Sequence, residues 1–224
     1  MLSLIKQLLT RIGARMSSHT LVQIQALVNY LRIGRWMRDR DFLFPARVFV
    51  RQEVWAAMIE RIRDQRVLYL EFGVAQGESM RYWARELKHP MSILHGFDSF
   101  EGLPEQSGPW QKGQFDTGGQ TPKIDDPRVR FFKGWFDQVL PAYVLPPHDV
   151  LVINLDADLY SSTIYVLNQL RSHIRPGTLI YFDEMNHVDH EPRAFDEFTN
   201  QNSLKFRPVC GDWTLAHVGF ECLS

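Results

Sequence analysis

Two pairs of acidic residues stand directly after apolar runs of the sequence. Asp156 and Asp158 follow the run LVINL, and Asp183 and Glu184 follow the run TLIYF. Such runs are typical of buried strands, which have no structural need to end in carboxylates. If the two strands are neighbours, Asp156, Asp183 and Glu184 lie close together. Clustered carboxylates repel one another unless a cation or a proton lies between them, and an all-oxygen cluster suits a hard ion such as Mg²⁺.

The acids also have a purely structural interpretation. Each could cap the helix that follows its strand, as Asp158 could for a helix opening at SSTIYV. Capping does not require acids at both strand ends, so we favour the metal site.

A glycine-bearing turn follows an earlier apolar run, VLYLEF. Glu71 near its end leads into GVAQGES, where Gly73 and Gly77 would let the backbone approach a ligand. This is neither the G-x-G-x-x-G dinucleotide fingerprint nor a phosphate-binding loop, and the preceding acid suits a ligand with an ammonium group. Asp98, after the run SILHGF, is placed to bind a ribose diol. Together these residues indicate an adenosine-containing ligand; the alternatives are a tight turn without a ligand and an aspartate that caps a turn.

The elements that position these residues are an alternation of strands and helices. Up to about residue 66 the apolar spacing predicts helices, and two strands close together are expected after residue 203. Strands are predicted at residues 67–72, 92–97, 129–132, 150–155 and 178–182. Nearly continuous apolar strands alternating with helices predict a parallel α/β sheet covered on both faces, here with an antiparallel edge hairpin.

One long segment, residues 101–127, carries five glycines and four prolines. It cannot be regular structure, and long loops in compact domains are usually functional or disordered. Its aromatic residues Trp110 and Phe115 could cover an acceptor or simply anchor the loop to the core.

Composition places the chain among globular proteins. The 224 residues are 45% hydrophobic and 12% aromatic, which indicates one substantial domain. The formal net charge of -1 gives no global attraction to nucleic acid. The two cysteines, Cys210 and Cys222, form neither a disulfide framework nor a zinc pattern, so reduced thiols in a cytoplasmic protein are expected.

The N-terminal region is basic and amphipathic. Residues 1–50 carry eight Lys or Arg against two Asp. Leu2, Ile5, Leu8, Leu9 and Ile12 recur at helical spacing. Such a helix usually packs on its own domain or on a partner subunit, and the other role that fits is contact with a membrane surface. We expect the first role, in a homo-oligomer. No apolar run reaches the length of a membrane span.

Several motifs together resemble the macrocin O-methyltransferase family over roughly residues 45–220. They are LEFGVAQGES, GFDSFEGLPE, GQF, the G-x-F of FFKGWFDQVLP, LDADLYSST and LIYFDE. The resemblance implies a class I S-adenosylmethionine-dependent methyltransferase with a Rossmann-like, seven-stranded, mostly parallel sheet. It implies an N-terminal helical extension at residues 1–48 and a methyltransferase domain at 49–224.

The resemblance also implies roles for individual residues. Mg²⁺ would be held by Asp156, Asp183 and Glu184. The pair at positions 183 and 184 is commonly Asp-Asp in the family, so Glu184 makes one of the two side chains longer. Asp158 matches the position of the family's general base, and His187 is a second candidate that could equally be a surface residue. Cofactor contacts would fall on Glu71, Gly73, Gly77, Ser79, Asp98, Ser99, Gly134 and Trp135, the last two near the adenine.

The expected activity is Mg²⁺-dependent transfer of a methyl group from S-adenosylmethionine to a hydroxyl of a sugar or glycosylated natural product. One alternative is a non-catalytic subunit that binds an adenosyl ligand. The other is a nicotinamide-dependent oxidoreductase, which the missing dinucleotide fingerprint disfavours. The sequence does not identify the acceptor, because the loops that contact it decide specificity.

Overall fold

The computed structural model describes residues 2–42 and 47–224. Its described part forms one sheet of eight strands in the order β1-β7-β8-β6-β5-β2-β3-β4. The strands are β1 (Arg47–Val48), β2 (Val67–Phe72), β3 (Ile93–Asp98), β4 (Val129–Lys133), β5 (Val150–Leu155), β6 (Leu179–Phe182), β7 (Phe206–Asp212) and β8 (Val218–Cys222). The helices are α1 (Leu2–Gly13), α2 (Ser18–Asp39), α3 (Arg51–Ile59), α4 (Glu78–Glu86), α5 (Phe136–Val139), α6 (Tyr160–Leu170) and α7 (Glu191–Asn202).

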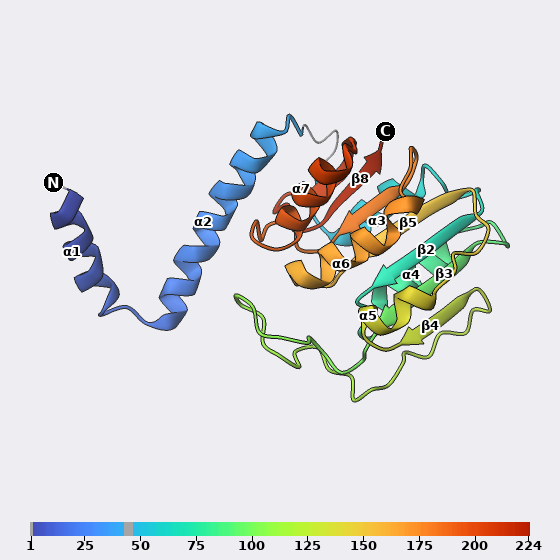
Figure 1. Ribbon diagram of the computed structural model, residues 1–224, viewed down its shortest axis with the longest axis horizontal. Coiled ribbons are helices and arrows are strands. Elements are labelled where there is room, and N and C mark those ends of the chain that lie inside the picture. The colour runs from blue at the N-terminus through green and yellow to red at the C-terminus, as the bar shows by residue number, and fades with distance from the viewer. Residues whose placement is uncertain (1, 43–46) are drawn as a thin grey trace.

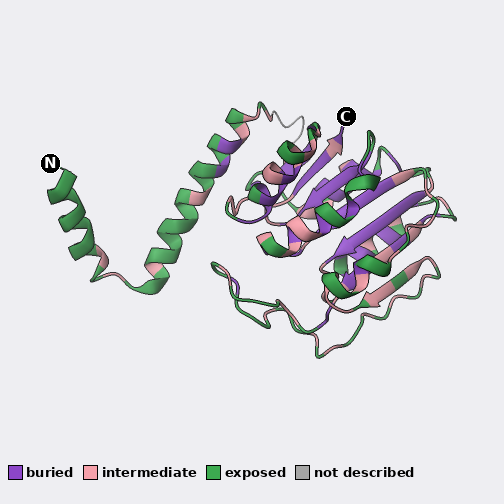
Figure 2. Cartoon of the chain, viewed as in Figure 1, coloured by how far each residue is buried: buried purple, intermediate pink, exposed green. Residues whose placement is uncertain are grey.

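Helices cover both faces of the sheet (Figure 1). Because successive strand residues point to opposite faces, β2 divides its side chains between two cores. Leu68, Leu70 and Phe72 pack with α6 and α7. Val67 and Tyr69 pack with α3 and α4. The central strands are buried along their length, as Figure 2 shows, which explains why their sequences are nearly continuous apolar runs.

The sheet has one strand more than the seven expected. The two-residue strand β1 pairs in parallel with β7, at the far edge of the sheet. The antiparallel pair β7 and β8 was predicted correctly, but β1 and not this hairpin forms the edge. Two residues carry too little periodicity to be recognised as a strand, which is why β1 was missed.

The order of the strands reverses between β2 and β5. From β2 the chain proceeds outward to β3 and β4, whereas β5 lies on the other side of β2 and pairs with it in parallel. β6 continues outward from β5, also in parallel. Loops at the carboxyl ends of strands diverge at such a reversal and leave a crevice that commonly binds ligands.

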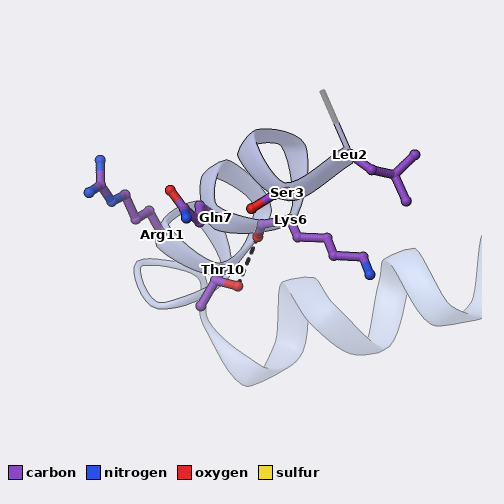
Figure 3. A pocket seen from close by; sticks show the side chains of 6 residues that line it. All are labelled: Leu2, Ser3, Lys6, Gln7, Thr10 and Arg11. Carbon is purple, nitrogen blue, oxygen red and sulfur yellow. Dashed lines mark hydrogen bonds between the residues drawn. The ribbon is translucent and has the colours of Figure 1, made fainter.

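Helices α1 and α2 extend away from the sheet (Figure 1). Only the C-terminal half of α2 joins the core, through Ile33 and Trp36. All six residues that line a shallow hollow on α1 belong to that helix itself, so the hollow is not an enclosed site (Figure 3). Within the described residues, no helix has both the length and the apolar character to cross a membrane.

Candidate functional site

A cavity of about 1090 Å³ opens at the carboxyl ends of β2, β3, β5 and β6. The turn after β2, the loop 101–127, the start of α5 and the start of α6 also contribute to its lining. Of the residues predicted for the site, those that line the cavity are Gly73, Ser79, Asp98, Ser99, Gly134, Trp135, Asp156, Asp158, Asp183 and Glu184. Glu71, Gly77 and His187 do not line it.

Asp98 organises the turn after β2. One carboxylate oxygen accepts hydrogen bonds from the backbone N–H groups of Val74 and Ala75, both at 2.8 Å. The other oxygen accepts the N–H of Phe100 at 2.7 Å. A carboxylate has about four acceptor positions, so one remains for a ligand hydroxyl. Asp98 therefore shapes the binding turn in addition to facing the cavity.

The two glycines of the turn serve close packing inside the protein. A Cβ on Gly73, whose φ is +90°, would lie 1.8 Å from the carbonyl oxygen of Asp156. A Cβ on Gly77, at φ +74°, would lie 2.9 Å from the side chain of Pro122. Gly73 thus lets the turn after β2 lie against the end of β5. The sequence predicted that both glycines let the backbone approach a ligand. In the structure, Gly73 lies against the backbone of Asp156 and Gly77 lies against the side chain of Pro122.

Glu71 lies beneath the cavity wall and is fully buried. The hydroxyl of Ser79 donates to one of its oxygens, and the Tyr69 hydroxyl donates to the other at 2.9 Å. Burial raises the pKa of Glu71 to about 8. The two hydrogen-bond donors lower this pKa, but the effect of burial is larger. The Tyr69 oxygen in turn accepts the side-chain amide of Asn154 at 2.6 Å. This buried chain links β5 to the start of α4 and fixes Ser79, which faces the cavity.

The other predicted cofactor residues lie on neighbouring loops. Ser99 is buried, and its hydroxyl oxygen accepts the N–H of Glu101 at 3.1 Å. The N–H of Gly134 donates to the carbonyl of Asp98 at 2.9 Å, which holds the end of β4 against β3. Trp135 is the next residue, and it stands directly before α5. A planar group between β3 and α5 would therefore lie beside Gly134 and Trp135.

The acidic pairs lie at the same edge of the sheet, as the strand arrangement requires. β5 and β6 are paired, with Leu155 opposite Phe182, so the residues after them lie at one edge. Burial, followed by the charges of Asp183 and Asp158, raises the pKa of Asp156 well above its usual value. Burial and the charge of Asp183 raise the pKa of Asp158 to about 7 and that of Glu184 to about 8. With pKa values raised in this way, these carboxyl groups hold protons when no cation balances their negative charge.

Asp183 differs from its neighbours because it has partners of opposite charge. His217 lies 3.1 Å from one of its oxygens, and Arg51 lies 3.6 Å from the other. Tyr181 also donates a hydrogen bond of 2.6 Å to Asp183. Burial acts to raise the pKa of Asp183, but His217, Tyr181 and Arg51 together lower it below its usual value.

The donor chemistry fits a hydrated Mg²⁺. Asp156, Asp183 and Glu184 offer only oxygen atoms, which hard cations prefer, and their mutual repulsion is what a cation would relieve. Across residues 2–42 and 47–224, however, no three His, Cys, Asp or Glu side chains converge as a ready-made metal site. An ion that keeps several waters and uses few protein ligands is compatible with this arrangement.

The two candidate bases lie in different surroundings. Asp158 is buried at the cavity wall and has a φ of +58°, a left-handed conformation that few non-glycine residues adopt. It does not cap the following helix, because α6 is preceded by Leu159 and has no side-chain cap. His187 does not line the cavity, and its Nε2 lies 3.5 Å from Glu184. Of the two, Asp158 lines the cavity.

Sequence reasoning missed three groups at the site. Arg51, at the start of α3, pairs with Glu78 as well as Asp183. His217 comes from the β7–β8 connection, and Glu191, fully buried at the start of α7, accepts the N–H of Glu184 at 2.8 Å. None of the three directly follows a strand of the parallel sheet or belongs to one of the family motifs, so no local signal marks them.

Comparison with known proteins concerns the family and the fold of the chain. The family model described as macrocin-O-methyltransferase matches residues 119–215, a little under half of the chain. The chain is 41% identical over 59 residues to 8-demethyl-8-(2,3-dimethoxy-alpha-L-rhamnosyl)-tetracenomycin-C 4'-O-methyltransferase of Streptomyces olivaceus. That match covers 26% of this chain and only 22% of the relative's length.

Solved structures share the fold. The O-methyltransferase NovP is 22% identical, with a TM-score of 0.53, over 77% of this chain and 78% of its own. The calicheamicin methyltransferase CalS11 is 18% identical, with a TM-score of 0.56, over 97% of this chain and 85% of its own. The fold is therefore the Rossmann-like α/β fold of these methyltransferases, and the matched segment confirms the resemblance to the macrocin O-methyltransferase family.

Proposed function

We propose that the protein is an O-methyltransferase that transfers the methyl group of S-adenosylmethionine to a hydroxyl of a sugar or glycosylated natural product, with Mg²⁺ held by Asp156, Asp183 and Glu184. One observation carries the proposal. A single cavity joins a glycine turn organised by Asp98 to a cluster of four carboxylates. The matched family segment and the rhamnosyl-tetracenomycin relative support the reaction and the acceptor class.

The cofactor end of the cavity is the turn after β2. Asp98 has one acceptor position left for a ribose hydroxyl, since two of its positions hold the turn after β2 and one accepts the N–H of Phe100 after β3. Ser79 faces the cavity above Glu71, whose buried carboxyl would gain a favourable charge interaction from a nearby ammonium group. Gly134 and Trp135 line the side where the adenine would lie.

The catalytic end of the cavity is the carboxylate cluster. When bound, S-adenosylmethionine supplies a methyl group activated by the sulfonium, and Mg²⁺ supplies a charge that orients and acidifies the acceptor hydroxyl. Asp158 accepts the hydroxyl proton at a carboxylate oxygen, since it is the candidate base that lines the cavity. Arg51 and His217 fix the position of Asp183. The loop 101–127 encloses the acceptor, and Phe115, 52% exposed, offers a surface for a sugar face.

The direct test is calorimetric titration of the purified protein with S-adenosylhomocysteine, with and without Mg²⁺. Three forms are compared: the natural chain, Asp98→Ala, and Asp125→Ala as a control that removes an exposed acid outside the cavity lining. We expect binding to the natural chain and the control, and a loss of at least about tenfold in affinity for Asp98→Ala, since a hydrogen bond to a charged group contributes roughly 1.5–3 kcal/mol.

The other results separate the rival functions. No binding of S-adenosylhomocysteine in either condition would overturn the proposal, and binding of a nicotinamide cofactor instead would support an oxidoreductase. Binding of the adenosyl ligand, without any Mg²⁺-dependent methyl transfer to a panel of rhamnosyl and amino-sugar glycosides, would support a non-catalytic subunit.

A further inference from the structure

The two acids at the end of β6 are held by different kinds of hydrogen bond. The N–H of Asp183 donates to a backbone carbonyl at the end of β5 at 3.0 Å, and the N–H of Met185 donates to a backbone carbonyl in the β7–β8 connection at 2.8 Å. Between them, the N–H of Glu184 donates to a side chain, the carboxyl of Glu191, at 2.8 Å. The backbone N–H of Glu184 therefore depends on this one side chain for its partner.

Glu191 approaches Glu184 from a rigid element. It is the first residue of α7, and its relative exposure is 0%. Helix α7 packs into the core through Phe195 and Phe198, which are also buried. The bond between Glu184 and Glu191 joins the two ends of the connection between β6 and α7. The end of β6 is thus tied to a helix as well as to the strands beside it.

The connection between β6 and α7 contains buried polar atoms without partners. Among the described residues, no hydrogen-bond partner reaches the second carboxyl oxygen of Glu191, Oδ1 of Asn186 or Nδ1 of His190. Each buried polar atom that stays unpaired costs free energy. A carboxyl is therefore an unfavourable group with which to fill this space, and the one hydrogen bond that it makes in the described part of the chain goes to Glu184.

The side chain of Glu184 needs such support more than that of Asp183. The Asp183 carboxylate has three side-chain partners that hold it, whereas the Glu184 carboxylate has, within the described residues, only His187 at 3.5 Å. Glutamate also has more rotatable bonds than aspartate, so its side chain loses more conformational entropy when it is fixed. With so few partners, the place of the Glu184 carboxylate at the cavity lining depends mainly on its backbone.

We propose that Glu191 is a positioning residue: its carboxyl holds the backbone of Glu184 and so keeps the Glu184 carboxylate at the cavity lining beside Asp183. That Glu184 is a metal ligand rests on the proposed function, but the bond between Glu184 and Glu191 does not. A ligand whose backbone is already fixed has fewer conformations to lose when it binds a cation. Loss of the bond should therefore weaken cation binding and leave the cofactor turn unaffected.

Amide hydrogen exchange of the Glu184 N–H, followed by NMR without cofactor or metal, tests the bond itself. Glu191→Gln keeps an acceptor oxygen at the same reach, Glu191→Met keeps the length of the chain without a strong acceptor, and Glu191→Asp withdraws the carboxyl by one methylene. Glu60→Met, which removes an exposed acid outside the cavity lining, is the control. Rates are compared with those of the amides of β5, which report global unfolding.

A positioning role predicts a distinct pattern of rates. Glu191→Met and Glu191→Asp should each speed exchange of the Glu184 amide about tenfold relative to β5, the effect of one lost hydrogen bond. Glu191→Gln should restore the rate of the natural chain, and Glu60→Met should leave it unchanged. Should Glu191→Met unfold, its β5 amides exchange as fast as Glu184, and the Asp and Gln variants decide.

Cation affinity is measured with Mn²⁺, a hard cation that stands in for Mg²⁺ and whose free form gives an EPR signal. Glu191→Met and Glu191→Asp should bind Mn²⁺ about tenfold or more weakly, the usual effect of removing a group that orients a metal ligand. Glu191→Gln and Glu60→Met should bind it as the natural chain does. The affinity for S-adenosylhomocysteine should be the same in all of them.

Three results would overturn the proposal. If Glu191→Met and Glu191→Asp exchange the Glu184 amide at the natural rate, Glu191 does not hold this backbone. If Glu191→Gln exchanges it as fast as Glu191→Met, the acceptor oxygen is not what matters. Faster exchange with unchanged Mn²⁺ affinity would limit Glu191 to a structural role. If the natural chain binds S-adenosylhomocysteine but no Mn²⁺, the metal site of the proposed function fails, whereas the exchange rates still decide whether Glu191 holds Glu184.

Discussion

Asp158 combines burial, a left-handed backbone and a position at the cavity wall. Its pKa is raised to about 7 by burial and by the charge of Asp183, so in the absence of a cation it exchanges its proton near neutral pH. A general base works best when its pKa lies near the working pH. These properties distinguish Asp158 from Asp183, whose pKa is lowered and whose oxygens already have partners.

Substitution Asp158→Asn should lower kcat by about 10²- to 10⁴-fold, the usual contribution of a general base. The affinity for S-adenosylhomocysteine should stay unchanged, because Asn keeps the shape and tolerates a positive φ. Radiolabelled methyl transfer to the first active glycoside, beside calorimetry, measures both quantities. Asp125→Asn is the control. Turnover equal to that of the natural chain would remove Asp158 from the role of base.

Glu71 makes stability depend on pH. Its pKa is raised from 4.5 to about 8 in the folded protein, so the folded state holds a proton that the unfolded state releases. A group of this kind contributes its stability below pH 4.5 and loses it as the pH rises towards 8. Relative to Glu71→Gln, the natural chain should therefore lose up to about 1.4 kcal/mol per pH unit in this window.

Urea unfolding at a series of pH values measures this difference, which should level off above pH 8. The two proteins share all the other buried carboxyls. Their titration therefore cancels in the difference between the two unfolding free energies. A difference in unfolding free energy that is the same at pH 5 and pH 8 would show that Glu71 is ionised in the folded protein throughout.

At the scale of elements, α7 anchors the start of the chain. The carboxylate of Asp196 accepts the Trp36 indole N–H at 2.8 Å and forms an ion pair with Arg40. Arg32 pairs with Asp189, just before α7, through two hydrogen bonds of 2.6 Å. These contacts and the burial of Ile33 dock the C-terminal half of α2, while its N-terminal half remains exposed.

Asp196→Ala should loosen this docking, because Trp36 and Arg40 lose their shared partner. Amide exchange in the last two turns of α2 should accelerate at least about tenfold, since a hydrogen bond to a charged group contributes roughly 1.5–3 kcal/mol. Asp39→Ala is the matched control: it removes ion pairs with Arg35 and Arg38 on the exposed side of α2, which contribute little. Equal exchange in the two variants would mean that apolar burial alone docks the helix.

At the scale of the whole molecule, the N-terminal helices leave much apolar surface uncovered. No residue of α1 is buried. Leu2, Leu4, Ile5, Leu8, Leu9 and Ile12 are each between 47% and 72% exposed. Contiguous exposed apolar surface of this kind usually marks an interface. A homo-oligomer therefore stays our prediction, with α1 and the N-terminal half of α2 covered by a second copy.

Light scattering of the full chain should give the mass of a dimer or larger assembly. Leu8→Glu, which places a charge on the apolar side of α1, should shift the mass towards the monomer, because burying an unpaired carboxylate is costly. Gln7→Glu adds the same charge at a polar position of α1 and should leave the mass unchanged. A monomer at micromolar concentration in the natural chain would contradict the prediction.

The sequence alone determined every strand except β1, the helices that alternate with the strands and the acids at the strand ends. These follow from local signals: an apolar run long enough for a buried strand, a glycine turn, and a polar residue where the run stops. The parallel arrangement then places Asp98, Asp156 and Asp183 at one edge, whatever the details of packing. Ten of the thirteen residues predicted for the site line the cavity, some found from these signals and the others from the family resemblance. Which residue holds the metal, the cofactor or the proton remains a proposal.

The tertiary structure decided which distant residues meet those acids. Arg51 and His217 both reach Asp183, yet they come from α3 and from the β7–β8 connection. Trp110 enters between two histidines of another loop. Such contacts depend on the order of strands in the sheet and on the path of loops over its edge. No local pattern encodes them, because each arises only when segments far apart in the chain fold against one another.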